Sequence, residues 1–332
     1  MLENRLIIDN DDAFSTYGLF VRDNGLAPLI GWPQFKKIAA NNWYEENGIE
    51  ADLTSPVLDG RQVQLQLYAM HDLTPSDLAP ILSMLRASVY HTFRVPTLGV
   101  KFVLRYVSNG SVGVNNRFDS LTLTLAEDFD GSIAGGRSKP AMGEEVTLDF
   151  GNNTTTSFRI AVPDIDSVPF SGYDIDGYDM SRFGMMVTKG TLDQMQRFDK
   201  VKEAMKRSSN YVEGVQYDSA GTVYSNHDDV TMKLHIRTDT VVDFWNRWYA
   251  LFAILMKSGE HILQGAGRRY RCYYKSMKVD KLYPLANGGV WCDFSVTMAV
   301  LGSMPIQIFG LTDNNVNKAI IDDDNVIISI IV

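Results

Sequence analysis

The sequence predicts a mainly β protein with one packed helix per repeat, an α+β arrangement in which one unit occurs twice along the chain. Three observations predict it: segments that recur at an offset of about 166 to 173 residues, runs of alternating apolar and polar residues, and two helical patterns that each follow a threonine. The length of 332 residues agrees, because about 150 residues per domain suggests about two domains.

Four segments recur in the same order when the chain is compared with itself. They pair residues 17–21 with 183–187, residues 44–48 with 211–214, residues 63–68 with 230–235, and residues 121–125 with 294–298. Each copy is therefore expected to contain a strand, a long loop, a strand, a helix and two further strands.

The strands are predicted from strict alternation. Apolar side chains at positions 63, 65 and 67 alternate with glutamines, which is typical of a half-buried sheet with a polar face. The glutamines are Gln62, Gln64 and Gln66, and Thr122 and Thr124 alternate in the same way on a later strand. These positions are candidates for a channel or an interface, and a plain solvent-facing sheet is an equal alternative.

Each predicted helix begins at a capping motif. Thr74 precedes Asp77 by three residues, and Thr240 precedes Asp243 by three, just ahead of an apolar helical pattern. The threonine hydroxyl can accept a bond from an amide of the first turn, and the acid favours the positive end of the helix dipole. Pro75 suits the first helical position, where its missing N–H costs nothing.

The second helix is apolar around much more of its circumference than the first. Aromatic and aliphatic residues follow one another from Phe244 to Met256 and include Trp245 and Trp248. A helix with such a wide apolar surface needs a partner besides its own sheet. Trp245 and Trp248 are therefore candidates for an assembly interface, and a place in the core of the monomer is the alternative.

The domain boundaries follow from the repeats. Residues 1–126 form the first copy, 127–180 a β-hairpin connector, 181–302 the second copy and 303–332 a C-terminal β segment. In the connector, residues 146–150 and 157–162 predict a hairpin around a turn of small polar residues. The apolar C-terminal segment is expected to pack with the connector or with a neighbouring subunit.

No pattern of catalytic or metal-ligating residues stands out. The five histidines are scattered, and the two cysteines, Cys272 and Cys292, are too few for a disulfide framework. The acidic runs at 9–12, 174–179 and 322–325 predict solvated turns, with metal binding as a minor alternative. The matched positions of the two copies are apolar, glycine or capping residues. We expect no catalytic residues, no cofactor, no metal and no enzymatic activity.

Charge and hydropathy limit the partners. The formal net charge of −9 argues against a protein that grips nucleic acid through a basic surface. The beginning of the chain has no pattern of a signal peptide, and the longest apolar stretches are far shorter than the ~20 residues that cross a bilayer. We expect a soluble protein made in the cytoplasm.

The repeated pattern resembles the tail-tube fold, which tube, distal-tail and baseplate-hub proteins of phages share. The opening of each copy, at 17–18 and 183–184, and the stretches at 44–48 and 57–65 are especially similar to distal-tail-type proteins of phages of Bacteroides-like hosts. The resemblance implies tandem tail-tube-like β-sandwich or barrel domains. Two copies in one chain depart from the single-copy distal-tail pattern, which leaves the stoichiometry open.

The resemblance implies a virion structural protein at the phage tail tip, made in the bacterial host. Its copies would form a ring around the DNA channel, as a trimer with pseudo-sixfold symmetry or as a hexamer. The ring would join the tail tube to the hub and to receptor-binding proteins for host attachment. During ejection DNA would pass without specific binding, helped by a lumen lined with carboxylates. The alternative is a β-rich carbohydrate- or protein-binding module of a bacterial or prophage surface apparatus.

Overall fold

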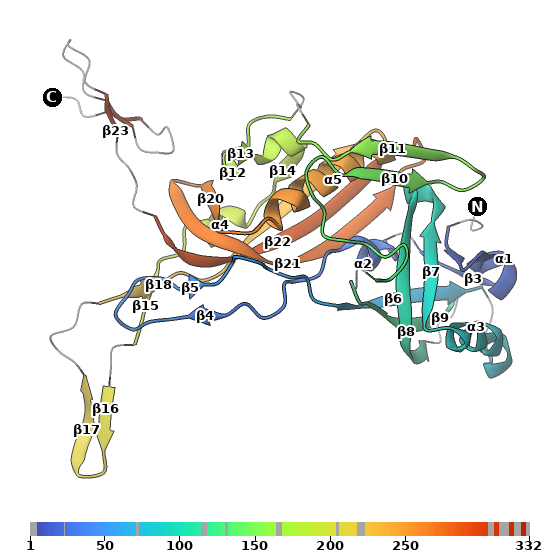
Figure 1. Cartoon of the computed structure of the whole chain (residues 1–332), viewed down its shortest axis with the longest axis horizontal. Helices are drawn as coiled ribbons and strands as arrows, with labels where there is room; N and C mark the ends of the chain where they lie inside the picture. Colours follow the sequence, from blue (N-terminus) through green and yellow to red (C-terminus); the bar gives the residue numbers. More distant parts are fainter. Residues whose placement is uncertain are drawn as a thin grey trace.

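The computed structural model describes residues 5–22, 24–70, 73–113, 118–129, 132–163, 168–203, 206–217 and 223–304, together with three short strands near the C-terminus. The protein is mainly β with few helices, as the sequence predicts. Two seven-stranded antiparallel sheets contain most of the strands. They lie one after the other along the molecule (Figure 1).

Both sheets have the same order of strands. The first runs β2 (Asp11–Asp12), β1 (Ile7–Ile8), β7 (Tyr90–Val95), β8 (Val100–Gly113), β9 (Asp119–Glu127), β6 (Arg61–Ala69), β3 (Leu19–Phe20). The second runs β13 (Tyr178–Asp179), β12 (Tyr173–Ile175), β20 (His261–Gly265), β21 (Arg268–Pro284), β22 (Val290–Ser303), β19 (Val230–Thr238), β14 (Met185–Val187). Each strand of the first sheet therefore has a counterpart in the second sheet, and the counterparts follow one another along the chain in the same order.

The register of the central strands also repeats. Val63 lies opposite Leu125 in the first sheet, and Val230 lies opposite Met298 in the second. The sequence comparison pairs these same positions. A register shift follows Tyr106 on β8 and another follows Tyr274 on β21, so both long strands bend at the same point.

Both copies open with the same local turn. A short helical segment, α1 (Ala13–Tyr17) or η2 (Met180–Phe183), begins at an aspartate whose side chain accepts a bond from a backbone amide. It ends at Gly18 or Gly184, with φ of 67° and 65°. Glycine adopts this left-handed conformation without strain, so the pairs at 17–18 and 183–184 mark helix ends.

The main helices begin where the capping motifs predict. Helix α3 (Pro75–Ala87) follows Thr74, whose amide donates to Asp77 Oδ2 at 2.9 Å. Helix α5 (Val241–Leu255) follows Thr240, whose Oγ1 accepts a bond from the Asp243 amide at 3.0 Å. Leu78, Ile81 and Leu85 bury one stripe of α3, whereas ten residues of α5 are buried.

The connector and the C-terminal strands form separate small sheets. Strands β10 (Glu145–Asp149) and β11 (Thr155–Arg159) pair as the predicted hairpin, and Phe158 contacts Tyr249 of α5. The tail strands β23 (Phe309–Leu311), β24 (Ala319–Ile321) and β25 (Ile327–Ser329) pair with one another, far from that hairpin (Figure 1). Within the described part of the chain the tail therefore does not pair with the connector.

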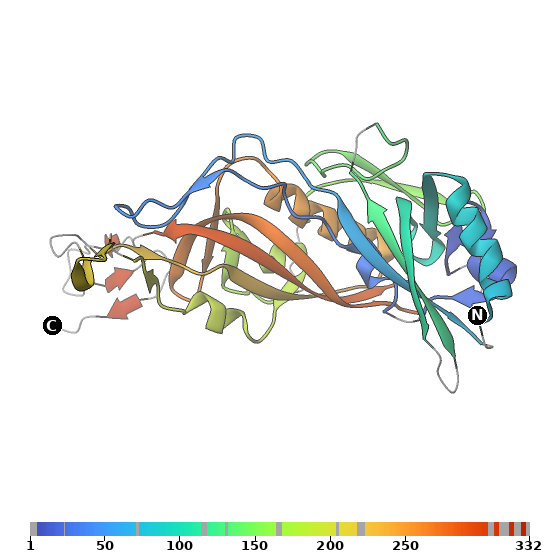
Figure 2. The same cartoon turned by 90° about the horizontal axis from the view of Figure 1, so that it is seen from below.

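Each copy has a long loop, which we call an arm. The first arm, residues 24–60 between β3 and β6, includes α2 (Ala27–Ile30), β4 (Ala40–Asn41) and β5 (Glu50–Ala51) and runs along the second sheet (Figure 2). The second arm lies between β14 and β19 and covers residues 188–203, 206–217 and 223–229. It includes α4 (Thr191–Met195), β15 (Lys200–Val201), β16 (Lys206–Ser209), β17 (Val212–Tyr217) and β18 (Ser225–Asn226).

Among the helices that the structure describes, none combines the length and apolar character needed to cross a bilayer.

Candidate assembly site at the junction of the sheets

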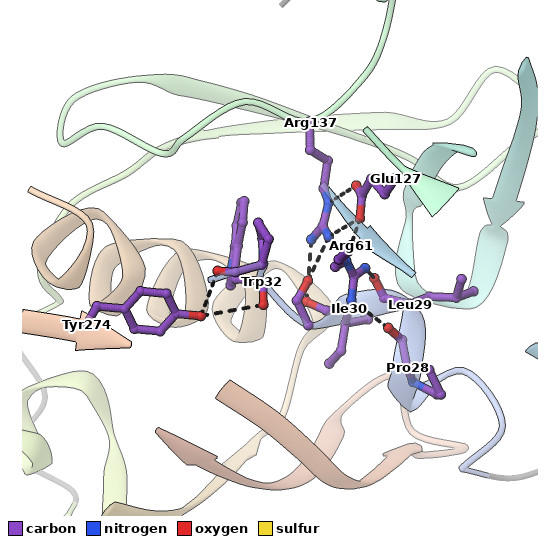
Figure 3. A network of polar contacts seen from close by, with 10 residues as sticks. Pro28, Leu29, Ile30, Trp32, Arg61, Glu127, Arg137 and Tyr274 are labelled. Carbon is purple, nitrogen blue, oxygen red and sulfur yellow. Dashed lines mark hydrogen bonds and ion pairs between the residues drawn. The ribbon is translucent and has the colours of Figure 1, made fainter. Parts of the chain in front are cut away.

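A buried ion network lies where the first arm leaves the first sheet (Figure 3). The Glu127 carboxylate, 3% exposed, accepts a bond from Arg61 Nε at 2.7 Å. It also accepts bonds from Arg137 Nε at 2.7 Å and from Nη2 at 2.8 Å. Arg61 comes from β6, Glu127 from the end of β9 and Arg137 from the connector, so the network ties three segments together.

Burial and charge oppose each other in this network. Burial lowers the pKa of Arg61 to about 10, against the pull of Glu127. Burial alone would raise the pKa of Glu127, but the two guanidiniums hold it below its ordinary value. All three groups therefore remain charged at neutral pH, and each depends on the others to offset the cost of its desolvation.

The two arginines also hold the backbone of the first arm. Arg61 donates to the carbonyl oxygens of Pro28 and Leu29, at 2.8 and 2.5 Å. Arg137 donates to Gly31 O at 2.7 Å, and its guanidinium lies 4.5 Å from the centre of the Trp32 ring. These bonds satisfy carbonyls at the end of α2 and fix the direction in which the arm continues.

The arm then seats its aromatic side chains on the second copy. Tyr274 of β21 donates from its hydroxyl to Pro33 O at 3.0 Å and lies 3.4 Å from Trp32 O. The Phe35 ring meets the Tyr274 ring edge to face at 5.7 Å, and Trp32 lies 5.9 Å from Phe252 of α5. Trp32 is 3% and Phe35 7% exposed, so the two copies share one continuous core here.

The far end of the arm approaches the last residues of β22. The Ile49 amide donates to Leu301 O at 2.6 Å, and the Gly259 amide donates to Leu53 O at 2.9 Å. Gly48 has φ of +77°, and a Cβ there would lie 2.0 Å from Leu301 O. The close approach of the two backbones therefore requires glycine at position 48.

The prediction that Trp245 and Trp248 lie at a subunit interface is wrong. Their side chains are 1% and 0% exposed. Trp245 Nε1 donates to Leu98 O of the first copy at 2.7 Å, and Trp248 packs on Phe294. The additional partner of α5 is the first copy together with the connector hairpin, so the wide apolar surface is covered within the chain.

The predicted polar face is present on β6. Gln62, Gln64 and Gln66 are exposed, and Val63, Leu65 and Leu67 between them are buried. Gln64 lies opposite Thr124 and Gln66 opposite Thr122 on β9. This uncharged strip lies on the side of the sheet away from the core, and its role in a channel or interface stays a prediction.

The copies share one pair of titratable side chains that the sequence comparison missed. His91 Nδ1 lies 2.5 Å from Asp9 Oδ2, and His261 Nδ1 lies 2.8 Å from Asp176 Oδ2. In each pair the second carboxylate oxygen accepts a bond from the amide of the residue after the histidine, at 2.7 and 2.8 Å. Both histidines are 2% exposed, so the pairs fasten the turns of β1–β2 and β12–β13 to β7 and β20.

These pairs give a structural role to two acidic runs that the sequence predicts as solvated turns, although the side chains of Asp9 and Asp176 stay 40% and 30% exposed. Asp9 and Asp176 adopt positive φ, 56° and 53°, at the tips of their turns. Asp12 and Asp179 cap the short helical segments that follow. The acids at 322–325 lie outside the described residues. The sequence does contain a trace of these pairs, because the aspartate recurs at an offset of 167 residues and the histidine at an offset of 170.

Replacing Asp176 by asparagine is expected to lower the free energy of unfolding by about 1–3 kcal/mol at pH 7, because a buried histidine loses a charged partner. Burial alone would raise the pKa of Asp176, but hydrogen bonds from His261 and the Ile262 amide hold it below its ordinary value. The stabilisation is therefore present above an unfolded pKa of about 4 and is lost as the pH falls through the lower folded pKa.

Urea unfolding at pH 7 and at pH values below 4 measures this difference. Replacing exposed Asp193 by asparagine is the control and should change little at either pH. A loss in the Asp176 variant that stays the same across this pH range would contradict the assigned role of the pair.

The remaining reactive groups are enclosed. Cys272 and Cys292 are buried free thiols, and burial raises the pKa of both. His235 pairs with Asp293, and His227 lies against the Tyr270 ring. His71 falls outside the described residues. Among the residues that can be described, no three His, Cys, Asp or Glu side chains are grouped to hold a metal.

The negative charge is not spread evenly along the chain. The connector, residues 127–180, has three bases and eleven acids, whereas residues 181–302 have seventeen bases and twelve acids. The exposed face of the second sheet carries six cations on β19 and β21: Lys233, Arg237, Arg271, Lys275, Lys278 and Lys281. This face has more cations than acids, and the expected carboxylate lining of a channel stays a prediction.

No protein-family model and no curated protein matches the chain. Among solved structures, the chain is similar to the Dit protein (gp 19.1) of SPP1, described as a paradigm of the hub adsorption apparatus in phages that infect Gram-positive hosts. The identity is 11% and the TM-score 0.28, and the match covers 89% of this chain and 98% of that chain. The aligned region covers most of both chains, but the two backbones superpose poorly over it.

Proposed function

We propose that this protein is a structural component of a phage tail tip, a distal-tail or baseplate-hub adaptor that forms a ring around the DNA channel. The observation that carries the proposal is the repeat itself: two sheets with one strand order, one register and one bend in a single chain. This architecture supports the tail-tube resemblance of the sequence.

The repeat gives the chain two like units in a head-to-tail order. Contacts between unlike faces of successive units close into rings when the rotation between units allows it. The outermost strands β2, β3 and β13 have two residues each, so they offer little free edge for strand pairing between subunits. The contacts of such a ring are therefore expected to come from side chains and arms.

The proposal includes no catalytic role. The titratable pairs that both copies share hold turns against strands, and their histidines are buried. The partners would be the tail tube on one side and the hub and receptor-binding proteins on the other. DNA would pass through the ring, past the glutamines and threonines of β6 and β9 in one copy and the lysines and arginines of β19 and β21 in the other.

Mass photometry and negative-stain imaging of the purified chain test this function. We expect particles of three or six chains with a central hole: three if both copies line the ring, and six if one copy lines it and the other lies outside. A chain that remains a monomer at every concentration, alone and with tail-tube protein, would contradict the proposal.

A further inference from the structure

The two arms occupy equivalent positions in the two copies. In the first arm Phe35 bridges to Leu58, and in the second Val201 pairs with Ser225 at offsets of 166 and 167 residues. A short helix precedes each bridge, α2 in one arm and α4 in the other. By this register Trp32 corresponds to Phe198, and Phe35 corresponds to Val201.

The equivalent side chains differ sharply in exposure. Trp32 and Phe35 are 3% and 7% exposed because the first arm is seated on the second copy. Phe198 and Val201 are 87% and 69% exposed. The β16–β17 hairpin of the second arm projects from the end of the molecule opposite the first sheet (Figure 1). The second arm therefore exposes Phe198 and Val201, at the positions where the first arm buries Trp32 and Phe35.

The surface around Tyr274 that binds the first arm, which we call the seat, also has an equivalent on the first copy. Tyr274 lies opposite Met298 just before the bend of β21, and Tyr106 lies opposite Leu125 just before the bend of β8. Tyr274 is fully buried by the first arm. Tyr106 is half-buried, and its hydroxyl donates to Asn109 Oδ1 at 2.8 Å within its own strand.

Apolar groups surround the seat on the first copy. Val89 stands two residues before His91, as Gly259, which binds the first arm, stands two residues before His261. Val89 is 62% exposed, and Val107 beside Tyr106 is 40% exposed. Tyr90 pairs with Arg105, so the preceding Val89 lies beside Tyr106. Val89, Tyr106 and Val107 therefore form a partly exposed apolar surface at the position where the second copy binds an arm.

We propose that the second arm of one chain docks on the surface of Val89, Tyr106 and Val107 of a second copy of this chain. The inference rests on the proposed ring and names its contact. The occupant is a second copy because the same chain already shows an equivalent arm on an equivalent seat. The contact joins two different surfaces, the second arm of one chain and the seat of the next. Each chain can therefore make the same contact with a further chain, as a ring requires.

This contact is less apolar than the one within the chain. The α5 residues Tyr249 and Phe252, which face Trp32, correspond to Ser83 and Arg86 of α3, both exposed. Less apolar area is buried, so the association between chains is reversible and depends on concentration.

Replacing Phe198 by aspartate tests the arm, with Val57 replaced by aspartate as the matched control. Val57 is 55% exposed on the first arm and belongs to neither proposed surface. We expect the F198D variant to need at least a tenfold higher concentration than wild type to assemble, with an unchanged far-UV spectrum, and V57D to behave as wild type. Equal assembly of F198D and wild type would overturn the inference.

Cross-linking of two single-cysteine variants tests the pairing itself. V201C and Y106C are mixed and treated with a short bifunctional maleimide, which leaves the buried Cys272 and Cys292 unmodified. We expect covalent dimers in the mixture and none in either variant alone. Rings of wild type without this cross-link would overturn only the docking site. Monomers without the cross-link at any concentration would overturn the ring as well.

Discussion

Replacing Glu127 by glutamine is expected to lower the free energy of unfolding by about 3–5 kcal/mol, because two buried guanidiniums lose their counter-charge. The Glu127 side chain is 3% exposed and that of Arg137 8% exposed, so water cannot take over these interactions. Urea unfolding followed by tryptophan fluorescence measures the change. The first arm should also become sensitive to proteolysis, since Arg61 and Arg137 hold its backbone.

A surface pair supplies the control for this variant. Glu260 lies 3.6 Å from Arg271, and both side chains are about two-fifths exposed. Replacing Glu260 by glutamine should cost less than about 1 kcal/mol. Replacing Arg61, Glu127 and Arg137 together by apolar residues should not restore stability, because the carbonyls at 28–31 would lose their donors. Full recovery in that triple variant would show that the network is needed only to balance its own charges.

Replacing Trp248 by alanine is expected to lower the free energy of unfolding by about 3–5 kcal/mol, the usual cost of removing a buried aromatic side chain. Trp248 is fully buried and packs on Phe244, Phe252 and Phe294. The far-UV spectrum and the unfolding midpoint of the monomer should therefore change. A variant that assembles poorly with a normal midpoint would restore the interface interpretation.

Conservative variants separate the two tryptophans. Trp245→Phe should cost about 1–3 kcal/mol, because Leu98 O loses its donor at the contact between the copies. Trp248→Phe should cost less, since Nε1 of Trp248 has no hydrogen-bond partner among the described residues. Trp43→Ala is the surface control: Trp43 is 49% exposed, and its loss should have little effect.

Local signals in the sequence predict much of the fold. The caps at Thr74 and Thr240 need only neighbours three residues away, and the alternation on β6 needs only one strand. The recurrence of short segments predicts that Val63 and Val230 occupy equivalent points of two sheets, and the strand pairing agrees. Each of these features depends on residues close together in one short segment, so the pattern of that segment is enough to predict it.

The junction could not be predicted in this way. Glu127 and Arg61 are 66 residues apart, and Tyr274 meets the arm across 241 residues. No fixed spacing marks such contacts, because the fold alone brings the residues together. The apolar surface of α5 showed that a partner exists, but hydrophobicity does not distinguish a partner in the same chain from one in another. The Asp–His pairs were missed because their members lie on different elements.

The seated first arm has a consequence for the order of folding. During synthesis Trp32 and Phe35 emerge long before Tyr274 and Phe252, on which they are buried. A nascent first copy therefore carries its arm loose until the second copy has been made. At high local concentration two chains can exchange their first arms before either arm has bound its own second copy, giving a domain-swapped pair with the same contacts. Slow or crowded expression should thus produce exchanged dimers that separate only on unfolding.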